Sequence, residues 1–249
     1  MEHKIKCPVC TGHRDDPCFI NDSNWKGICH RCKTTFKGDL ARKVLFEAKN
    51  IHRVPNLSLQ APELVDAWGN REAREFLYSR GVDEDMLPSI EFSESERRIY
   101  FRIWGVSEEF PRSYHRRVVY KQREGIPKWS VMPGTHKKYY LYGGVKPGAK
   151  QVCLVEGIWD QLKIGENCIA LLGTSLSLPQ LCYFKLLSPK PEINLFLDKN
   201  DEAGEKAEKD LHGVFEYHGF NVRVIDADRE PGNYYTGHPV LKRVQEMLR

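Results

Sequence analysis

The sequence lacks any long hydrophobic run. No apolar stretch in its 249 residues approaches the roughly 18–20 residues that a helix needs to span a bilayer. The opening residues MEHKIKCPVC contain no apolar segment of the kind that a secretory signal requires. We therefore expect no membrane insertion and a reducing, cytoplasmic compartment. A Walker-type glycine-lysine loop is also missing, so these residues do not provide a helicase motor.

The chain also has little net charge. Lys and Arg number 38 and Asp and Glu 34, and the difference of +4 is too small to indicate a nucleic-acid partner. The charge is uneven, however, because residues 112–138 hold eight cations and one acid, Glu124. Aromatic residues such as Trp129 are interleaved with these cations, a mixture that suits phosphate binding and base stacking. The residues predicted to bind nucleic acid or nucleotide are Arg116, Arg117, Lys121, Arg123, Lys128 and Lys137. A solvated strand face is the alternative.

Disulfides are not expected in a reducing compartment, so the eight cysteines need another explanation. Four of them form two CxxC pairs, Cys7 with Cys10 and Cys29 with Cys32. Each pair can direct two thiolates at one ion, and two pairs complete a tetrahedral structural zinc site. A segment of this size buries too little apolar surface to fold alone, so zinc would supply its folding free energy. We predict a zinc-binding ribbon over residues 1–38. The alternative is that these cysteines form disulfides or are spare thiols.

Other residues of the ribbon are assigned different roles. Trp25 and Arg31 can stack on bases and contact phosphates, and a ribbon that merely folds is the alternative. His13 and His30 are not needed as ligands, because four cysteines already close the zinc site. Cys18 is expected to be a bystander.

The next two stretches differ in pattern. Residues 39–60 contain a short helical pattern followed by loop-forming residues, which predicts a linker. Residues 61–149 combine a helix that ends near Gly81 with strands at 99–106 and 113–121. This pattern predicts a mixed α+β subdomain that carries the cations.

Residues 150–249 alternate short apolar runs with helical patterns. The runs lie at 152–156, 168–172, 193–197 and 220–225. Runs of this length between helices are typical of buried parallel strands, so we predict an α/β fold with a doubly wound parallel sheet. The helix after the third strand is expected to bury one face made of Ala203, Ala207, Leu211, Val214 and Phe215.

Carboxylates gather where two of these strands end. The first strand runs into Glu156 and Asp160, and the third runs into Asp198 and Asp201. The carboxyl ends of parallel strands meet at one edge of a sheet, so these acids would repel one another unless a divalent cation lay between them. Oxygen ligands favour Mg²⁺, and such a site indicates phosphoryl or nucleotidyl transfer. The alternative is that these acids are only helix caps, a role that Asp201 or Glu202 could fill ahead of the helix at Ala203.

The order of these features resembles DNA primases of the phage and bacterial type, in which a zinc-binding domain precedes a TOPRIM polymerase domain. The chain is similar to the primase half of phage primase-helicases, and the resemblance covers nearly all of it. The motifs that carry it are the two CxxC pairs, FLYSRGV at 76–82, the cationic segment, Glu156-Gly-x-x-Asp160, LGTSLSLPQ at 172–180 and the acid-Ala-Gly run at 201–204. The implied fold is a TOPRIM-type sheet preceded by the mixed basic subdomain and the ribbon.

The resemblance implies a template-directed RNA polymerase that makes short primers on single-stranded DNA from ribonucleoside triphosphates. Glu156, Asp198 and Asp201 would hold one or two Mg²⁺ or Mn²⁺ ions, and Asp160 would be an accessory catalytic acid. The zinc module would help to select the start site, and the loop at 173–174 would lie beside the metals. A replicative helicase would act in trans, and a phage-encoded enzyme would work in the cytoplasm of its bacterial host.

The chain departs from the family pattern at the metal ligands. Two residues separate Asp198 from Asp201 where the family usually has one, which changes how the two carboxylates are aimed. Glu230 stands where the family usually has aspartate and is assigned as a further Mg²⁺ ligand. Two other functions stay open: a non-catalytic, recombination-mediator-like DNA-binding protein and a metal-dependent TOPRIM nuclease.

Overall fold

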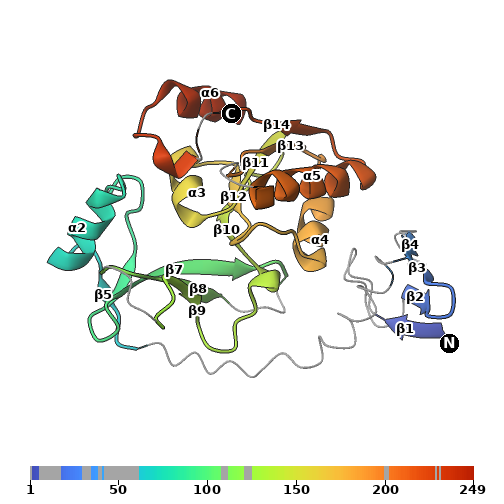
Figure 1. Cartoon of the computed structure of the whole chain (residues 1–249), viewed down its shortest axis with the longest axis horizontal. Helices are drawn as coiled ribbons and strands as arrows, with labels where there is room; N and C mark the ends of the chain where they lie inside the picture. Colours follow the sequence, from blue (N-terminus) through green and yellow to red (C-terminus); the bar gives the residue numbers. More distant parts are fainter. Residues whose placement is uncertain are drawn as a thin grey trace.

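The structure is a computed structural model (Figure 1). It describes residues 2–5, 18–29, 35–38, 41, 62–107, 112–120, 125–198, 202–227, 229 and 231–249. Apart from residue 41, the predicted linker at 39–60 lies outside these residues. The described strands form a four-stranded sheet near the N-terminus and a ten-stranded sheet in the rest of the chain.

The N-terminal sheet is antiparallel, in the order β1-β2-β3-β4. Its strands are β1 (Glu2–Ile5), β2 (Cys18–Asn21), β3 (Lys26–Cys29) and β4 (Thr35–Lys37). Ile20 of β2 and Phe36 of β4 are buried. All four strands of this sheet lie within residues 1–38, the predicted zinc-binding ribbon.

The middle of the chain is a mixed α+β region, as predicted. Its elements are β5 (Val65–Asp66), α2 (Arg71–Ser79), β6 (Glu91–Ser93), β7 (Arg98–Gly105), β8 (Ser113–Val118), β9 (Trp129–Val131), η1 (Lys137–Tyr139) and β10 (Tyr140–Gly144). Asn70 caps the N-terminus of α2, because its side chain accepts a hydrogen bond from the amide of Ala73 at 3.2 Å. It ends just before Gly81, which confirms the predicted end of this helix.

The C-terminal part alternates strands and helices. Its elements are β11 (Gln151–Val155), α3 (Ile158–Ile164), β12 (Cys168–Ala170), α4 (Leu178–Leu186), β13 (Glu192–Leu195), α5 (Glu202–Tyr217), β14 (Val222–Val224), η2 (Pro231–Asn233) and α6 (Pro239–Met247). The four strands are parallel, in the order β14-β13-β11-β12, and lie at the four predicted runs. Antiparallel β10 connects β12 to β7. None of the described helices is long and apolar enough to cross a membrane.

The parallel sheet has a buried core on each face, because successive strand residues point to opposite sides. In β11, Cys153 and Val155 belong to the cluster that contains α3 and α6. Val152 and Leu154 belong to the cluster that contains α4 and α5. This arrangement confirms the doubly wound sheet. The predicted apolar face of α5 is wrong at one position, because Val214 is 38% exposed.

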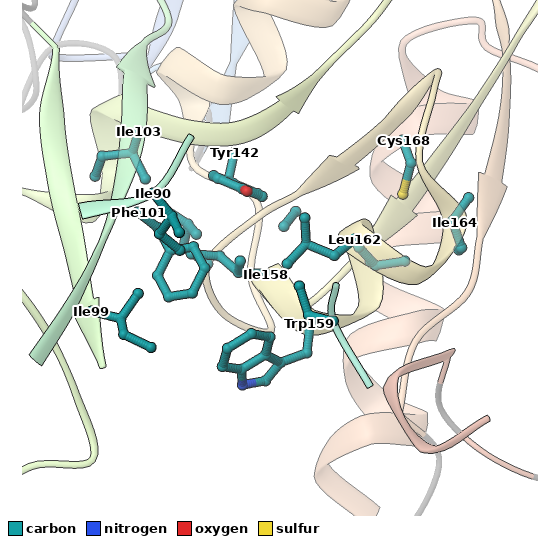
Figure 2. Packing of buried hydrophobic residues seen from close by; sticks show 14 of the residues in the cluster. Ile90, Ile99, Phe101, Ile103, Tyr142, Ile158, Trp159, Leu162, Ile164 and Cys168 are labelled. Carbon is teal, nitrogen blue, oxygen red and sulfur yellow. The ribbon is translucent and has the colours of Figure 1, made fainter. Parts of the chain in front are cut away.

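The core on the α3 side continues into the middle region. Ile99, Phe101 and Ile103 of β7 belong to the same cluster as Ile158 and Trp159 of α3 (Figure 2). The Phe101 and Trp159 rings meet edge to face, with their centroids 5.2 Å apart. The cationic region is therefore packed directly against the helix that follows β11.

Candidate active site

Two of the predicted metal ligands lie at one edge of the parallel sheet. β11 and β13 are parallel neighbours in which Leu154 pairs with Leu195. Glu156 follows β11 directly and Asp198 follows β13 by three residues, and both are half-buried. The sheet therefore carries these two carboxylates to the same end of adjacent strands. We term this end the acidic edge.

Asp160 lies in the first turn of α3 and is held by two backbone amides. Its Oδ2 accepts a hydrogen bond from Gly157 N at 3.0 Å, and its Oδ1 accepts one from Gly232 N at 2.8 Å. Burial raises the pKa of the Asp160 carboxyl, the two amides lower it, and the negative charge of Asp198 raises it again. Asp160 thus fastens η2 to the start of α3, and its coupling to Asp198 reflects negative charge converging at the acidic edge.

The donors at the acidic edge are carboxylate oxygens, the ligands that Mg²⁺ and Mn²⁺ prefer. Within the described part of the chain, no three His, Cys, Asp or Glu side chains lie close enough to form a metal site. Both oxygens of Asp160 accept backbone hydrogen bonds, so this carboxylate has fewer lone pairs left for a metal ion. Asp201 and Glu230, which complete the predicted set, lie outside the described residues. The residues present fit a hard cation that takes further oxygen ligands.

Arg117 brings a desolvated cation to the side of β8 that faces α3. It pairs in register with Trp129 of β9, so both side chains point to the same face. Its guanidinium carbon lies 5.1 Å from the Phe76 ring centroid and 5.7 Å from that of Trp129. Burial, and then the charges of Arg80 and Arg98, lower the pKa of Arg117 to about 10. Its Nε is buried and has no hydrogen-bond partner among the described residues.

Arg80 brings a second cation to α3. It follows α2, and its guanidinium carbon lies 5.4 Å from the ring centroid of Trp159, the residue before Asp160. Its positive charge lowers the pKa of Asp160. In the part of the chain that the structure describes, its buried Nε also lacks a partner. The charges of Arg80 and Arg117 thus influence each other, and the charge of Arg80 also influences the carboxylate of Asp160.

His115 lies on the same face of β8 as Arg117. Its ring stacks on Trp129, with 4.7 Å between centroids and 29° between planes. Burial, with a contribution from the charge of Lys137, lowers the pKa of His115 from 6.5 to about 3. The imidazole is therefore neutral at pH 7, and its Nδ1 has no partner within the described ranges. We term this group the cationic-aromatic cluster: Arg80, His115, Arg117, Trp129 and Trp159.

Arg116 points to the opposite face of β8. Its Nη1 donates to Glu96 Oε2 at 2.9 Å, and its Nη2 donates to the carbonyl of Val131 at 3.1 Å. Its guanidinium carbon lies 5.8 Å from the Tyr100 ring centroid. Like that of Arg117, its Nε is without a partner in the described residues. Arg116 therefore lies away from α3 and carries its own counter-ion.

The predicted lysines lie at the rim of this region. Lys128 is exposed. Lys137 is also exposed, and its Nζ donates to the carbonyl of Leu172 at 3.1 Å, next to the loop at 173–174. Lys121 and Arg123 lie outside the described residues. Lys137 is thus bound next to the loop predicted to border the metals.

The N-terminal sheet contains one of the four predicted zinc ligands. Cys29 ends β3 and is buried, opposite buried Cys18 in the register of β2 and β3. Cys7, Cys10 and Cys32 lie outside the described residues, as do Arg31, His13 and His30. Trp25 lies in the turn between β2 and β3 with a φ of 49°. The zinc site stays a prediction.

No role was predicted for Arg80, His115 or Trp159 from the sequence. Arg80 lies inside the 76–82 motif, where an arginine before a glycine at the end of a helix is a signal for a fixed turn. His115 alternates with Arg117 along one strand, so strand parity links the two once β8 is known. Trp159 lies inside the Glu156 motif, directly before Asp160, and its uncharged ring gives no signal of a metal or phosphate ligand.

No family model and no curated protein matches this sequence. Solved structures do match. The DnaG primase catalytic domain bound to single-stranded DNA is 18% identical, with a TM-score of 0.53 over 83% of this chain and 79% of that one. The DnaG catalytic core is 19% identical, with a TM-score of 0.49 over 67% of this chain and 69% of that one. The first of these matches shows that the chain has a DnaG primase-type fold.

Proposed function

We propose that this chain is a DNA primase that synthesises short RNA primers on single-stranded DNA from ribonucleoside triphosphates. The observation that carries the proposal is the meeting of unlike charges at the first turn of α3. Asp160 of that turn is coupled to Asp198 on the acidic side and to Arg80 on the basic side. Nucleotidyl transfer needs both, because acids that hold metal and arginines that hold phosphate act on one triphosphate. The DnaG-type fold supports the same activity.

In this proposal the acidic edge holds the metal ions. Glu156 and Asp198, with Asp201 and Glu230, would bind one or two Mg²⁺ or Mn²⁺ ions. Such an ion polarises the phosphoryl group and stabilises the negative charge that develops during transfer. Asp160 serves the reaction by keeping η2 against the start of α3, next to these ligands.

The cationic-aromatic cluster would bind phosphates. Arg80 and Arg117 each have a buried Nε that lacks a partner among the described residues and can donate to a phosphate oxygen. The low effective polarity around Arg117 strengthens such a bond. Lys137 adds a positive charge beside the 173–174 loop, and Lys128 adds one at the rim.

The N-terminal segment would be the zinc module of a phage or bacterial primase. Cys7, Cys10, Cys29 and Cys32 would bind one structural Zn²⁺. Trp25 and Arg31 would contact the template when the start site is selected. A replicative helicase acting in trans would be the partner, in the cytoplasm of a bacterial host if a phage encodes the chain.

Zinc content tests this module. Cys29→Ser should lose the single zinc ion that we expect in each wild-type chain, and initiation on natural templates should fall with it. Cys18→Ser is the matched control, because Cys18 is the buried cross-strand neighbour of Cys29. Elemental analysis checks both variants. Full zinc content in Cys29→Ser would refute the four-cysteine site.

Incorporation of labelled ribonucleotides on single-stranded DNA, with Mg²⁺ or Mn²⁺, tests the main proposal. Glu156→Gln should reduce synthesis more than about 100-fold, because it removes a charged metal ligand. Glu192→Gln is the matched control: Glu192 starts β13 at the opposite edge of the sheet, where it pairs with Arg223 at 3.2 Å. We expect this control to make normal amounts of short RNA.

The other outcomes separate the alternatives. Undiminished synthesis by Glu156→Gln would refute the acidic edge as the active site. DNA binding without product on varied templates, with a helicase supplied, would favour the recombination-mediator function. Shortened template in place of new RNA would indicate a nuclease.

A further inference from the structure

Lys163 is a buried lysine that the proposed chemistry does not use. It lies on α3 and is 5% exposed. Its Nζ donates to the carbonyl of Gly81 at 2.5 Å and to Thr236 Oγ1 at 3.1 Å. Thr236 Oγ1 also donates to the same carbonyl at 3.3 Å. One ammonium group thus joins α3 to a turn 82 residues before it and a loop 73 residues after it.

Burial makes this arrangement costly, which argues that it has a specific use. A charged amine loses its hydration when it is buried, and hydrogen bonds recover only part of that free energy. In agreement, burial lowers the pKa of Lys163; the charge of Asp83 raises it and that of Arg80 lowers it. A methionine of similar length would fill the space without this penalty. The contribution of the ammonium is therefore its hydrogen bonds to Gly81 and Thr236, which an apolar side chain could not make.

Gly81 is shaped to receive the ammonium. Its φ is +66°, a left-handed conformation that side-chain-bearing residues rarely adopt. A Cβ atom at this position would lie 2.5 Å from Lys163 Nζ, closer than any real contact allows. Position 81 therefore needs glycine both for its backbone conformation and for the approach of Lys163.

The turn after α2 meets α3 at two points. Trp159 and Lys163 are four residues apart on α3, so they lie on one side of the helix. Arg80 covers the ring of Trp159 at 5.4 Å, and the neighbouring carbonyl of Gly81 binds Lys163. The first contact is a soft cation–π interaction, whereas the second is a charge-assisted hydrogen bond. The second contact is therefore the one that fixes the turn.

We propose that Lys163 is a positioning residue that holds Arg80 against Trp159 and the acidic edge. Without Nζ, the Gly81 carbonyl loses its charged donor and the turn that carries Arg80 can move. Glu156 and Asp198 would stay in place, because β11 and β13 carry them. The effect on activity rests on the proposed function, whereas the effect on the turn does not.

The chain contains a matched control in Lys190 and Gly219. Lys190 Nζ donates to the carbonyl of His218 at 2.7 Å and to that of Gly219 at 3.1 Å. Gly219 has a φ of +73°, and a Cβ there would lie 3.3 Å from Lys190 Nζ. This lysine–glycine contact joins the turns that precede β13 and β14, at the edge opposite the acidic edge.

Primer synthesis by Lys163→Met gives the first test. We expect kcat/KM to fall at least tenfold, and Gly81→Ala to show the same loss. Lys190→Met and Gly219→Ala should stay within twofold of wild type. In an Arg80→Ala background, Lys163→Met should add less than a twofold loss, because the group that it positions is gone. An equal loss in both backgrounds would overturn the proposal and make Lys163 a general stabilising residue.

Amide hydrogen exchange tests the positioning without any activity. The amides of Gly81 and Val82 bond to the carbonyls of Tyr78 and Leu77 at 2.9 and 3.1 Å. We expect their exchange to accelerate at least tenfold in Lys163→Met, with the amides of β11 unchanged. Unchanged exchange would overturn the proposal. Accelerated exchange in a chain that makes no primers would support the positioning and refute only the proposed function.

Thr236→Val keeps the test possible if Lys163→Met does not fold. Thr236 is exposed, so its replacement should leave the core intact while it removes one partner of Lys163 Nζ. We expect a two- to threefold loss of kcat/KM that disappears in the Arg80→Ala background. A loss of the same size in both backgrounds would contradict the proposal.

Discussion

The two faces of β8 use the same residue type in opposite ways. Arg116 donates to the carboxylate of Glu96, so its charge is neutralised where it stands. Arg117, the next residue, points to the other face and contacts no carboxylate among the described residues. Its charged neighbours are Arg80 and Arg98. Among the described residues, Arg116 is thus paired with a carboxylate, whereas the acceptor of Arg117 is the backbone carbonyl of Val118.

The same pairing extends across the face that carries Arg116. Arg102 of β7, which lies on the same face as Arg116, binds Glu91 at 2.9 Å. The excess of cations between residues 112 and 138 therefore overstates the charge available to a polyanion, because acids outside that segment neutralise part of it. The net charge of a segment says little about a binding site until strand parity divides it between two faces.

Alanine substitutions of Arg116 and Arg117 should show the largest difference between the two faces of β8. Arg117→Ala should weaken nucleotide or single-stranded DNA binding about 100-fold, because a buried charge-assisted bond to phosphate contributes up to about 3 kcal/mol. Arg116→Ala should change binding less than about threefold, because its partner is already Glu96. Fluorescence titration with a labelled oligonucleotide and competing triphosphate measures both.

The salt dependence gives the control for this comparison. Loss of one phosphate contact should lower the slope of log affinity against log salt by about 0.7 for single-stranded DNA. We expect that change in Arg117→Ala and none in Arg116→Ala. Equal losses of affinity and slope in the two variants would mean that both faces of β8 bind nucleic acid.

The parallel sheet could be predicted because its strands are continuous apolar runs separated by helical patterns. Burial on both faces makes such runs apolar throughout, so their position needs no knowledge of register. The acidic edge followed from the same runs, since Glu156 and Asp198 come where β11 and β13 end. The exposed Val214 on α5 escaped prediction because helical periodicity does not say how far a neighbouring layer reaches.

The faces of β8 could not be read from the sequence. Arg116 and Arg117 are followed by Val118 and Val119, so alternation gives neither arginine an inner side until the pairing with β7 is known. Lys163 looks like an ordinary solvated lysine of a helix, because its partners lie 82 and 73 residues away. Contacts of that range are set by how α2 and the C-terminal loop pack on α3, which no local pattern reports.

The smallest predicted effect is on stability and concerns His115. It tests whether protonation of His115 is unfavourable on the face of β8 that carries Arg117. The pKa of His115 is about 3 in the folded chain against 6.5 ordinarily, so the unfolded chain takes up the proton first as the pH falls below 6.5. Stability is then lost as the pH falls, by about 2 kcal/mol between pH 7 and pH 5. His115→Gln should lack this part of the loss in urea unfolding, and His136→Gln, at an exposed histidine, should retain it. Identical pH profiles for wild type and His115→Gln would mean that the imidazole accepts its proton beside Arg117 without penalty, and the face would then be open to solvent rather than closed around a desolvated cation.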